Sequence, residues 1–261
     1  MKYLTTLLLI LSVISVTEAK LHTELVEYHV GDKVMEGYLA YDDATTARRP
    51  GVLVVHEWMG INDYTRMRCD QLARLGYVAF APDIYGKGVR PSTPGEAGAL
   101  AGSLKSDRPT MRARAAAGLA VLKENRMVER RKIAAIGYCF GGTVALELAR
   151  SGADVAGTVS IHGGLDTPTP GDARNILGRV LVLHGADDPN VPPAQVAAFQ
   201  QEMRDAKIDW YMVAYGNAVH AFTNPSAGND PSKGAAYNAT ADRRSWVELM
   251  SFFEEIFDLG K

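Results

Sequence analysis

The positions of apolar and polar residues predict strands that alternate with helices. Two extended segments, 24–30 and 34–41, flank Gly31-Asp32, which predicts a hairpin. After them, short apolar runs typical of buried strands alternate with segments of helical spacing. The predicted strands cover 51–56, 77–82, 132–137, 155–161, 180–184 and 210–215. The predicted helices cover 63–75 (capped by Asp63), 96–104, 141–150 and 193–206, a segment with Met111, Ala115, Leu119 and Leu122 on one side, and a last one that buries Trp246, Leu249, Met250, Phe253 and Phe257.

This order of elements predicts an α/β fold. Strands joined by helical crossovers form a mostly parallel central sheet with helices on both faces. No internal repeat or linker interrupts the chain, so residues 20–261 are predicted to form a single domain. The longest loop signal, 223–233, follows the last predicted strand, and we expect it to border the functional site.

The composition is that of an ordinary globular protein. The 261 residues are 47% hydrophobic and 22% charged, with a formal net charge of −2. That charge gives no general attraction to nucleic acid, and the basic stretch 126–132 is read as a solvated helix end and loop. We therefore expect no nucleic-acid partner, while the oligomeric state is not determined by the sequence.

The first nineteen residues have the pattern of an export signal. Lys2 precedes an apolar run over 4–16, and Thr17-Glu18-Ala19 places small residues where a signal peptidase reads them. The run is short for a transmembrane span. The alternatives are an uncleaved anchor or a buried strand. We predict a signal peptide over 1–19, an exported periplasmic or secreted protein, and no stable membrane insertion after cleavage.

The strongest chemical motif is Gly137-Tyr138-Cys139-Phe140-Gly141-Gly142, between a predicted buried strand and a predicted helix. This is the nucleophile-elbow pattern of α/β-hydrolases with Cys in place of Ser. Glycines two residues before and after Cys139 would let the strand and the helix approach closely. The helix N-terminus would favour a thiolate. The alternative is a glycine-rich turn with an inert thiol.

A nucleophilic thiol requires a base, and the base requires an orienting group. In α/β-hydrolases the acid follows a later strand and the histidine follows the last one. Asp187 and Asp188 follow the predicted strand 180–184, so both are candidates for the acid. His220 follows the strand 210–215 and is the candidate base.

The segment after the strand 51–56 is the usual source of an oxyanion-hole amide, with the residue after the nucleophile as a second source. Here these donors would be the backbone N–H groups of Trp58 and Phe140. Glu57 is unexpected beside a thiolate, because a second negative charge opposes its formation. The alternative is an exposed loop glutamate.

The remaining histidines are weaker candidates. His56, His162 and His184 end predicted strands, and we expect them to make structural hydrogen bonds beneath the site. No metal-binding spacing and no phosphate-binding glycine loop occurs, so no metal and no cofactor is predicted.

Taken together, these motifs resemble the dienelactone hydrolase family over nearly the whole chain after residue 19. The resemblance implies that Asp188 is the acid, and that Glu57 holds the resting thiol and helps to deprotonate it. The motifs that carry the resemblance are His56-Glu57, Pro82-Asp83-Ile84-Tyr85, the 137–142 elbow, Asp188 three residues before Val191-Pro192, and His220-Ala221-Phe222.

The resemblance also indicates where substrate would lie. Tyr85, Lys87 and Asn224 are candidate substrate contacts. In some members of the family, two arginines hold a substrate carboxylate, at the positions of Lys87 and Asn224. Asn224 carries no charge, so dienelactone is not expected as the natural substrate. The predicted reaction is hydrolysis of a small ester or lactone through a Cys-His-Asp triad and a thioester.

Two alternatives belong to other functional classes. In a thiol redox protein, Cys139 would react and Cys69 would resolve the disulfide. Cys69, however, shares a helical face with Leu72 and Ala73, which predicts a core position. The other alternative is a binding protein that kept the fold and lost its activity.

Overall fold

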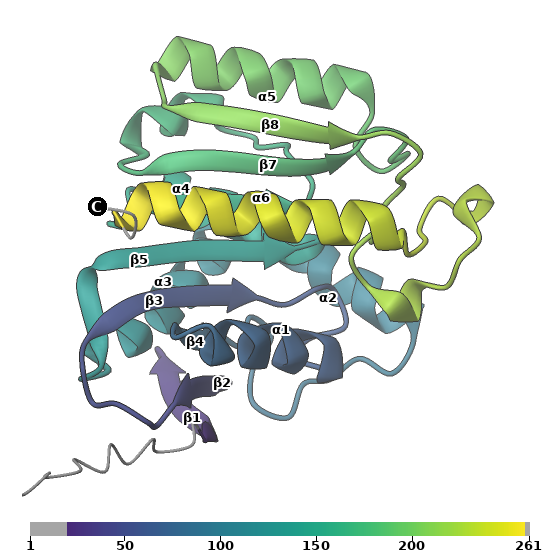
Figure 1. Cartoon of the computed structure of the whole chain (residues 1–261). Coiled ribbons are helices and arrows are strands. Elements are labelled where there is room, and N and C mark those ends of the chain that lie inside the picture. The colour runs from purple at the N-terminus through teal and green to yellow at the C-terminus, as the bar shows by residue number, and fades with distance from the viewer. Residues whose placement is uncertain (1–19, 259–261) are drawn as a thin grey trace, which may run out of the picture.

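The computed structural model describes residues 20–258, in which eight strands form one mostly parallel sheet (Figure 1). The strand order is β1-β2-β4-β3-β5-β6-β7-β8. The β1–β2 hairpin is antiparallel and joins β4 in antiparallel fashion, whereas the pairs from β4 to β8 are parallel. The strands are β1 (Leu21–Val30), β2 (Lys33–Asp42), β3 (Arg49–Val55), β4 (Val78–Ala81), β5 (Val128–Tyr138), β6 (Gly157–Ile161), β7 (Arg179–Gly185) and β8 (Trp210–Tyr215).

Helices cover both faces of the sheet, as the sequence predicts. One face packs against α1 and α6, and the other against α2 to α5. In Figure 1, α6 crosses in front of the sheet. The cap of α1 is Asn62 rather than the predicted Asp63, because the Asn62 side chain accepts the Thr65 N–H. The helices are α1 (Asp63–Arg74), α2 (Pro94–Ser106), α3 (Arg108–Glu124), α4 (Phe140–Arg150), α5 (Pro193–Ala206) and α6 (Ala239–Phe257).

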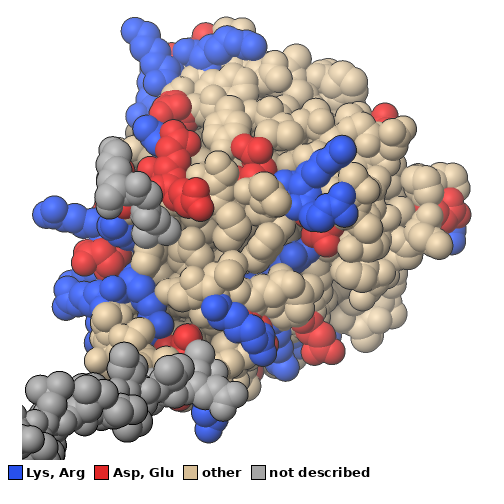
Figure 2. Space-filling model, viewed as in Figure 1, with Lys and Arg blue, Asp and Glu red and all other residues tan. Residues whose placement is uncertain are grey.

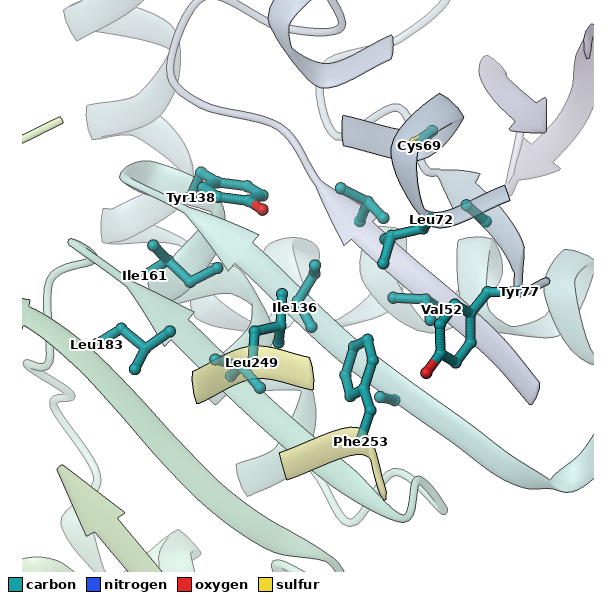
Figure 3. Packing of buried hydrophobic residues seen from close by; sticks show 14 of the residues in the cluster. Val52, Cys69, Leu72, Tyr77, Ile136, Tyr138, Ile161, Leu183, Leu249 and Phe253 are labelled. Atoms are coloured by element: carbon teal, nitrogen blue, oxygen red, sulfur yellow. The ribbon is translucent and has the colours of Figure 1, made fainter. Parts of the chain in front are cut away.

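The two cores follow from the alternation of side chains along buried strands. On β3, Val52 and Val54 face the α1–α6 core, whereas Leu53 and Val55 face the opposite core. Figure 3 shows Val52 in the first core beside side chains of β5, α1 and α6. Because both faces of β3 are buried, its sequence is a continuous apolar run.

This topology gathers the loops that carry the predicted chemistry. Strands β3, β5, β6, β7 and β8 run in the same direction, so their carboxyl ends share one edge of the sheet. Ligands of open α/β sheets bind at that edge. The predicted loop 223–233 also lies in the segment after β8. It contains two short 3₁₀ turns that the sequence did not indicate, η2 (Pro225–Ala227) and η3 (Pro231–Lys233).

Another 3₁₀ turn, η1 (Pro170–Asn175), connects β6 to β7. The predicted signal peptide, residues 1–19, lies outside the described residues. Within 20–258, no helix is long and apolar enough to cross a membrane.

On the face in Figure 2, acidic and basic side chains lie beside one another instead of forming one broad basic surface.

Candidate active site

Cys139 stands on a sharp turn between β5 and α4. Its backbone has φ 55° and ψ −119°, a conformation that non-glycine residues seldom adopt. A Cβ atom on Gly137 would lie 1.9 Å from the Gly141 carbonyl oxygen, and one on Gly141 would lie 2.3 Å from that of Val55. The predicted glycine requirement is therefore confirmed: both positions must lack a side chain for α4 to approach β5 and β3.

Three side chains form a continuous line at this turn. The Nε2 atom of His220 lies 3.0 Å from Sγ of Cys139, and its Nδ1 lies 2.8 Å from Oδ2 of Asp188. Asp188 is buried, and its Oδ1 accepts the Asn190 N–H at 2.8 Å. Asp187 is exposed. The fold thus brings Asp188, and not Asp187, to the histidine.

The loop after β8 holds His220 at both backbone groups. Its N–H donates to the Gly234 carbonyl, and its own carbonyl accepts the Ala236 N–H. Burial alone would lower the pKa of His220, but the Cys139 thiolate and the Asp188 carboxylate outweigh burial and raise it to about 10. The arrangement therefore favours the protonated form of His220 beside the thiol.

Glu57 is buried beside this line and is held by Asn224. The Nδ2 atom of Asn224 donates to Oε2 of Glu57 at 2.6 Å. Burial raises the pKa of Glu57, against the opposing effects of Asn224, His220 and Arg68. Among the described hydrogen bonds, the thiol of Cys139 contacts His220, and Glu57 contacts Asn224 instead of the thiol.

The predicted oxyanion donors belong to two neighbouring segments. Phe140 is the first residue of α4, and Trp58 lies in the turn after β3. The Tyr85 hydroxyl donates to the Trp58 carbonyl at 2.8 Å, and its ring stacks on Phe140 with 5.7 Å between centroids. Tyr85 is almost fully buried, so it supports both segments from beneath.

Two of the predicted substrate contacts have other partners in the structure. The Lys87 amine pairs with Glu27 on β1 and Glu36 on β2, which directs it toward the hairpin. Asn224 is buried against Glu57, and its Oδ1 accepts the Ser226 N–H, so both ends of its amide are occupied. Such partners are set by folding, and no spacing in the sequence reveals them.

Two of the strand-ending histidines make the structural hydrogen bonds that the sequence predicts. His56 contacts the Glu57 carbonyl through Nδ1 and accepts the Ile84 N–H at Nε2. His162 accepts the Cys139 N–H and contacts the Thr223 hydroxyl. The role of Thr223 was missed, because nothing in a loop sequence marks a threonine as the partner of a distant histidine.

Cys69 has the surroundings of a core residue and not those of a reactive thiol. It is fully buried on α1 among apolar side chains (Figure 3), and burial raises the pKa of its thiol. Both cysteines are free. Within 20–258, no cluster of three or more His, Cys, Asp or Glu side chains could hold a metal ion.

An open groove of about 520 Å³ lies elsewhere on the molecule. Its lining includes Gly178, Arg179 and Asp209, at the amino ends of β7 and β8. Cys139 follows the carboxyl end of β5, so this groove belongs to the opposite edge of the sheet. Its Arg179 is paired with Asp209 and Glu255, and nothing there resembles the chemistry around Cys139.

The topology and the elbow define an α/β-hydrolase fold. The model of the dienelactone hydrolase family matches residues 35–257, and the chain belongs to that family. It is accordingly a carboxylic ester hydrolase of the dienelactone hydrolase type.

The chain is also similar to two solved structures and to one further protein. The structure named m3DLH is 40% identical, with a TM-score of 0.87 over 90% of this chain and 98% of that one. A dienelactone hydrolase-like promiscuous phosphotriesterase from metagenomic libraries is 39% identical, with a TM-score of 0.85 over the same shares. The uncharacterized protein K02A2.1 of Caenorhabditis elegans is 38% identical over 59% of this chain and 99% of its own length.

Proposed function

We propose that the protein hydrolyses small esters or lactones through a Cys-His-Asp triad. Cys139 is the nucleophile, His220 the base and acid, and Asp188 the orienting carboxylate. The observation that carries the proposal is the line of contacts from the thiol through both imidazole nitrogens to Asp188, at 3.0 and 2.8 Å. Nucleophile, base and orienting group in hydrogen-bond reach are what covalent catalysis requires.

The reaction has two halves. The Cys139 thiolate attacks the carbonyl carbon and forms a C–S bond, while the amides of Trp58 and Phe140 stabilise the oxyanion. His220 then protonates the leaving oxygen as the C–O bond breaks, which leaves a thioester. In the second half His220 removes a proton from water, the hydroxide attacks the thioester, and the thiolate leaves with the carboxylic acid as product.

Glu57 is proposed to assist the thiol. Burial raises the pKa of Glu57, which suits a carboxylate that accepts a proton from the thiol and returns it. In the structure Asn224 holds Glu57, and the thiol contacts His220. These contacts correspond to a state in which His220 already holds the thiol. We propose that Glu57 contacts the thiol in an earlier state and then moves to Asn224.

The alternatives fit the structure less well. A resolving Cys69 would have to leave a fully buried core position. A protein that only binds its ligand would have no need for the aligned Cys139, His220 and Asp188 side chains. One relative is called a promiscuous phosphotriesterase, so neutral phosphotriesters belong among the compounds to be tested.

The deciding experiment compares wild type with Cys139→Ala and Cys69→Ala. The substrates are short-chain aryl esters, a thioester, an unsaturated lactone and a neutral phosphotriester. Wild type and Cys69→Ala should turn over at least one of them, and Cys139→Ala should turn over none. Mass spectrometry of an acid-quenched reaction should detect the acyl group on Cys139. Equal activity of the Cys139→Ala variant would refute the proposal.

The pattern of residues 1–19 supports a second proposal, that the protein is exported to the periplasm or secreted. The N-terminus of the natural mature protein should then be Lys20. A mature protein that begins at Met1 would exclude cleavage. We propose that the partners of the enzyme are small-molecule substrates.

A further inference from the structure

His162 occupies a strained and fully enclosed position directly after β6. Its φ is 40°, in the left-handed region that a non-glycine residue rarely adopts, and only 1% of the residue is exposed. Such backbone strain persists only where the surroundings hold it in place, and it concentrates at functional sites. The strain is therefore a first indication that the imidazole is needed where it lies.

Both ring nitrogens of His162 have partners. The Cys139 N–H lies 3.1 Å from Nδ1, so Nδ1 is an acceptor and the proton resides on Nε2. Nε2 then donates to the Thr223 hydroxyl oxygen at 2.7 Å. The Cys139 N–H is shared with the Ile161 carbonyl oxygen at 3.0 Å, so the imidazole adds a side-chain restraint to the backbone of the nucleophile.

The same ring also contacts the base. His162 meets the ring of His220 edge to face, with 5.4 Å between centroids and an angle of 67°. On another side it meets Phe222 in the same manner, at 5.2 Å and 79°. A single imidazole thus touches the backbone of Cys139 and the side chain of His220, and the distance from the thiol of Cys139 to Nε2 of His220 decides proton transfer.

The contact to Thr223 connects this ring to a buried series of hydrogen bonds between polar side chains. The Thr223 hydroxyl lies 2.6 Å from the Tyr64 hydroxyl, and the Nε of Arg68 donates to Tyr64 at 3.3 Å. Arg68 also donates to the Thr223 carbonyl at 2.9 Å and pairs with Asp242 on α6. These hydrogen bonds fix the orientation of Thr223, and Thr223 in turn holds the plane of the His162 ring.

We propose that His162 is a positioning residue that sets the distance and orientation between the Cys139 thiol and the His220 imidazole. It acts as a neutral ring, with one nitrogen accepting the Cys139 N–H and the ring packed edge to face with His220. The inference deepens the proposed hydrolase function and rests on it. The alternative is a structural role, in which His162 merely fills space beneath the site.

The test uses two variants of His162 and a remote control. His162→Gly accommodates the backbone conformation but removes the ring. His162→Asn also tolerates that conformation, and its Oδ1 can still accept the Cys139 N–H. Leu119→Ala creates a cavity beside α3, in the core on the face of the sheet opposite to α1 and α6. This variant controls for loss of stability. Thermal unfolding is measured for each protein.

Misalignment of reacting groups by about 1 Å typically costs about a hundredfold in rate. We expect His162→Gly to lower kcat by about ten- to a hundredfold with KM within about twofold, and His162→Asn to restore part of that loss. The rate at which iodoacetamide alkylates Cys139 at pH 7 should be highest in wild type, lower in His162→Asn and lowest in His162→Gly. Leu119→Ala should lower the unfolding temperature and leave kcat and alkylation near wild type.

The alkylation rate separates this inference from the proposed function, because it requires no turnover. If Cys139→Ala remains active, the hydrolase mechanism fails, whereas alkylation still reports on His162. If His162→Gly unfolds, His162→Asn decides, since it also lacks the ring against His220. A His162 variant that folds and keeps wild-type kcat and alkylation would overturn the positioning role.

Discussion

The amide nitrogen of Asn224 lies 2.6 Å from a carboxylate oxygen of Glu57, and both side chains are buried. The amide cannot turn freely, because its oxygen accepts the Ser226 N–H at 2.9 Å. A neutral donor therefore holds a buried carboxylate near His220. This contact leads to two predictions, one on stability and one on substrate charge.

Replacing Asn224 with Asp should destabilise the protein in a pH-dependent manner. The variant sets two carboxylates against each other, so the buried pair retains a proton and its pKa is raised above that of the unfolded chain. Stability should therefore increase as the pH falls through the raised pKa. We expect a loss of about 1–3 kcal/mol at pH 8 and a smaller loss at pH 5, measured by urea unfolding.

The control is Asn62→Asp at the N-cap of α1, where the side-chain oxygen accepts the Thr65 N–H and Asp caps as well as Asn. That variant should unfold like wild type at both pH values. An Asn224→Asp protein with an equal deficit at pH 5 and pH 8 would contradict the charge argument.

Glu57 should select against anionic substrates. Two like charges about 8 Å apart repel by about 2 kcal/mol at an effective dielectric constant of about 20. At pH 8 we expect kcat/KM for a neutral ester to exceed that for an ester of equal size with a carboxylate by about tenfold or more. Glu57→Gln should narrow the ratio. Steady-state kinetics on the paired esters check this, and an unchanged ratio in the variant would count against it.

Asp188→Asn should impair the base and leave the fold intact. Without the carboxylate, the pKa of His220 falls from its raised value of about 10, and the imidazolium is less stable. Loss of the orienting acid in comparable triads costs up to about ten-thousandfold in kcat, and we expect a loss of at least about a hundredfold here. Asp187→Asn, at the exposed neighbour, is the matched control and should remain active. Similar kcat values for the two variants would argue against the assigned role of Asp188.

His56 should weaken the fold in acid. Burial lowers its pKa to about 4, below the unfolded value of about 6.5. Between these values the unfolded chain binds more protons, so stability falls as the pH drops, by up to about 1.4 kcal/mol per pH unit. Urea unfolding at pH 7, 6 and 5 should show a shallower decline for His56→Asn than for wild type. A parallel decline would assign the acid sensitivity to other groups.

The pattern of the sequence was sufficient for most of the fold. Buried strands of a parallel sheet are continuous apolar runs, and the segments at 51–56, 132–137 and 180–184 appear as β3, β5 and β7. The cap of α1 was misplaced by one residue, since Asn62 and Asp63 are both good caps and only the backbone conformation distinguishes them. The short 3₁₀ turns were missed because they lack a periodic pattern.

The candidate site was predictable where a motif has a local physical cause. Gly137, Cys139 and Gly141 form a recognisable elbow because only glycine allows the close approach that the turn requires. His220 was found by chain order. The choice between Asp187 and Asp188 did not follow from chain order, because adjacent residues differ only in which one the loop turns inward.

The sequence by itself determined the order of elements, the elbow and the residue types available at the carboxyl edge of the sheet, because these depend on local backbone sterics and on apolar periodicity. Only the tertiary structure decided which side chains meet. It directed Lys87 to the β1–β2 hairpin, set Asn224 against Glu57, and placed His162 between Cys139 and His220. Those contacts join residues that are 23 to 167 positions apart, and such pairings are settled by packing and by the need of buried polar groups for partners.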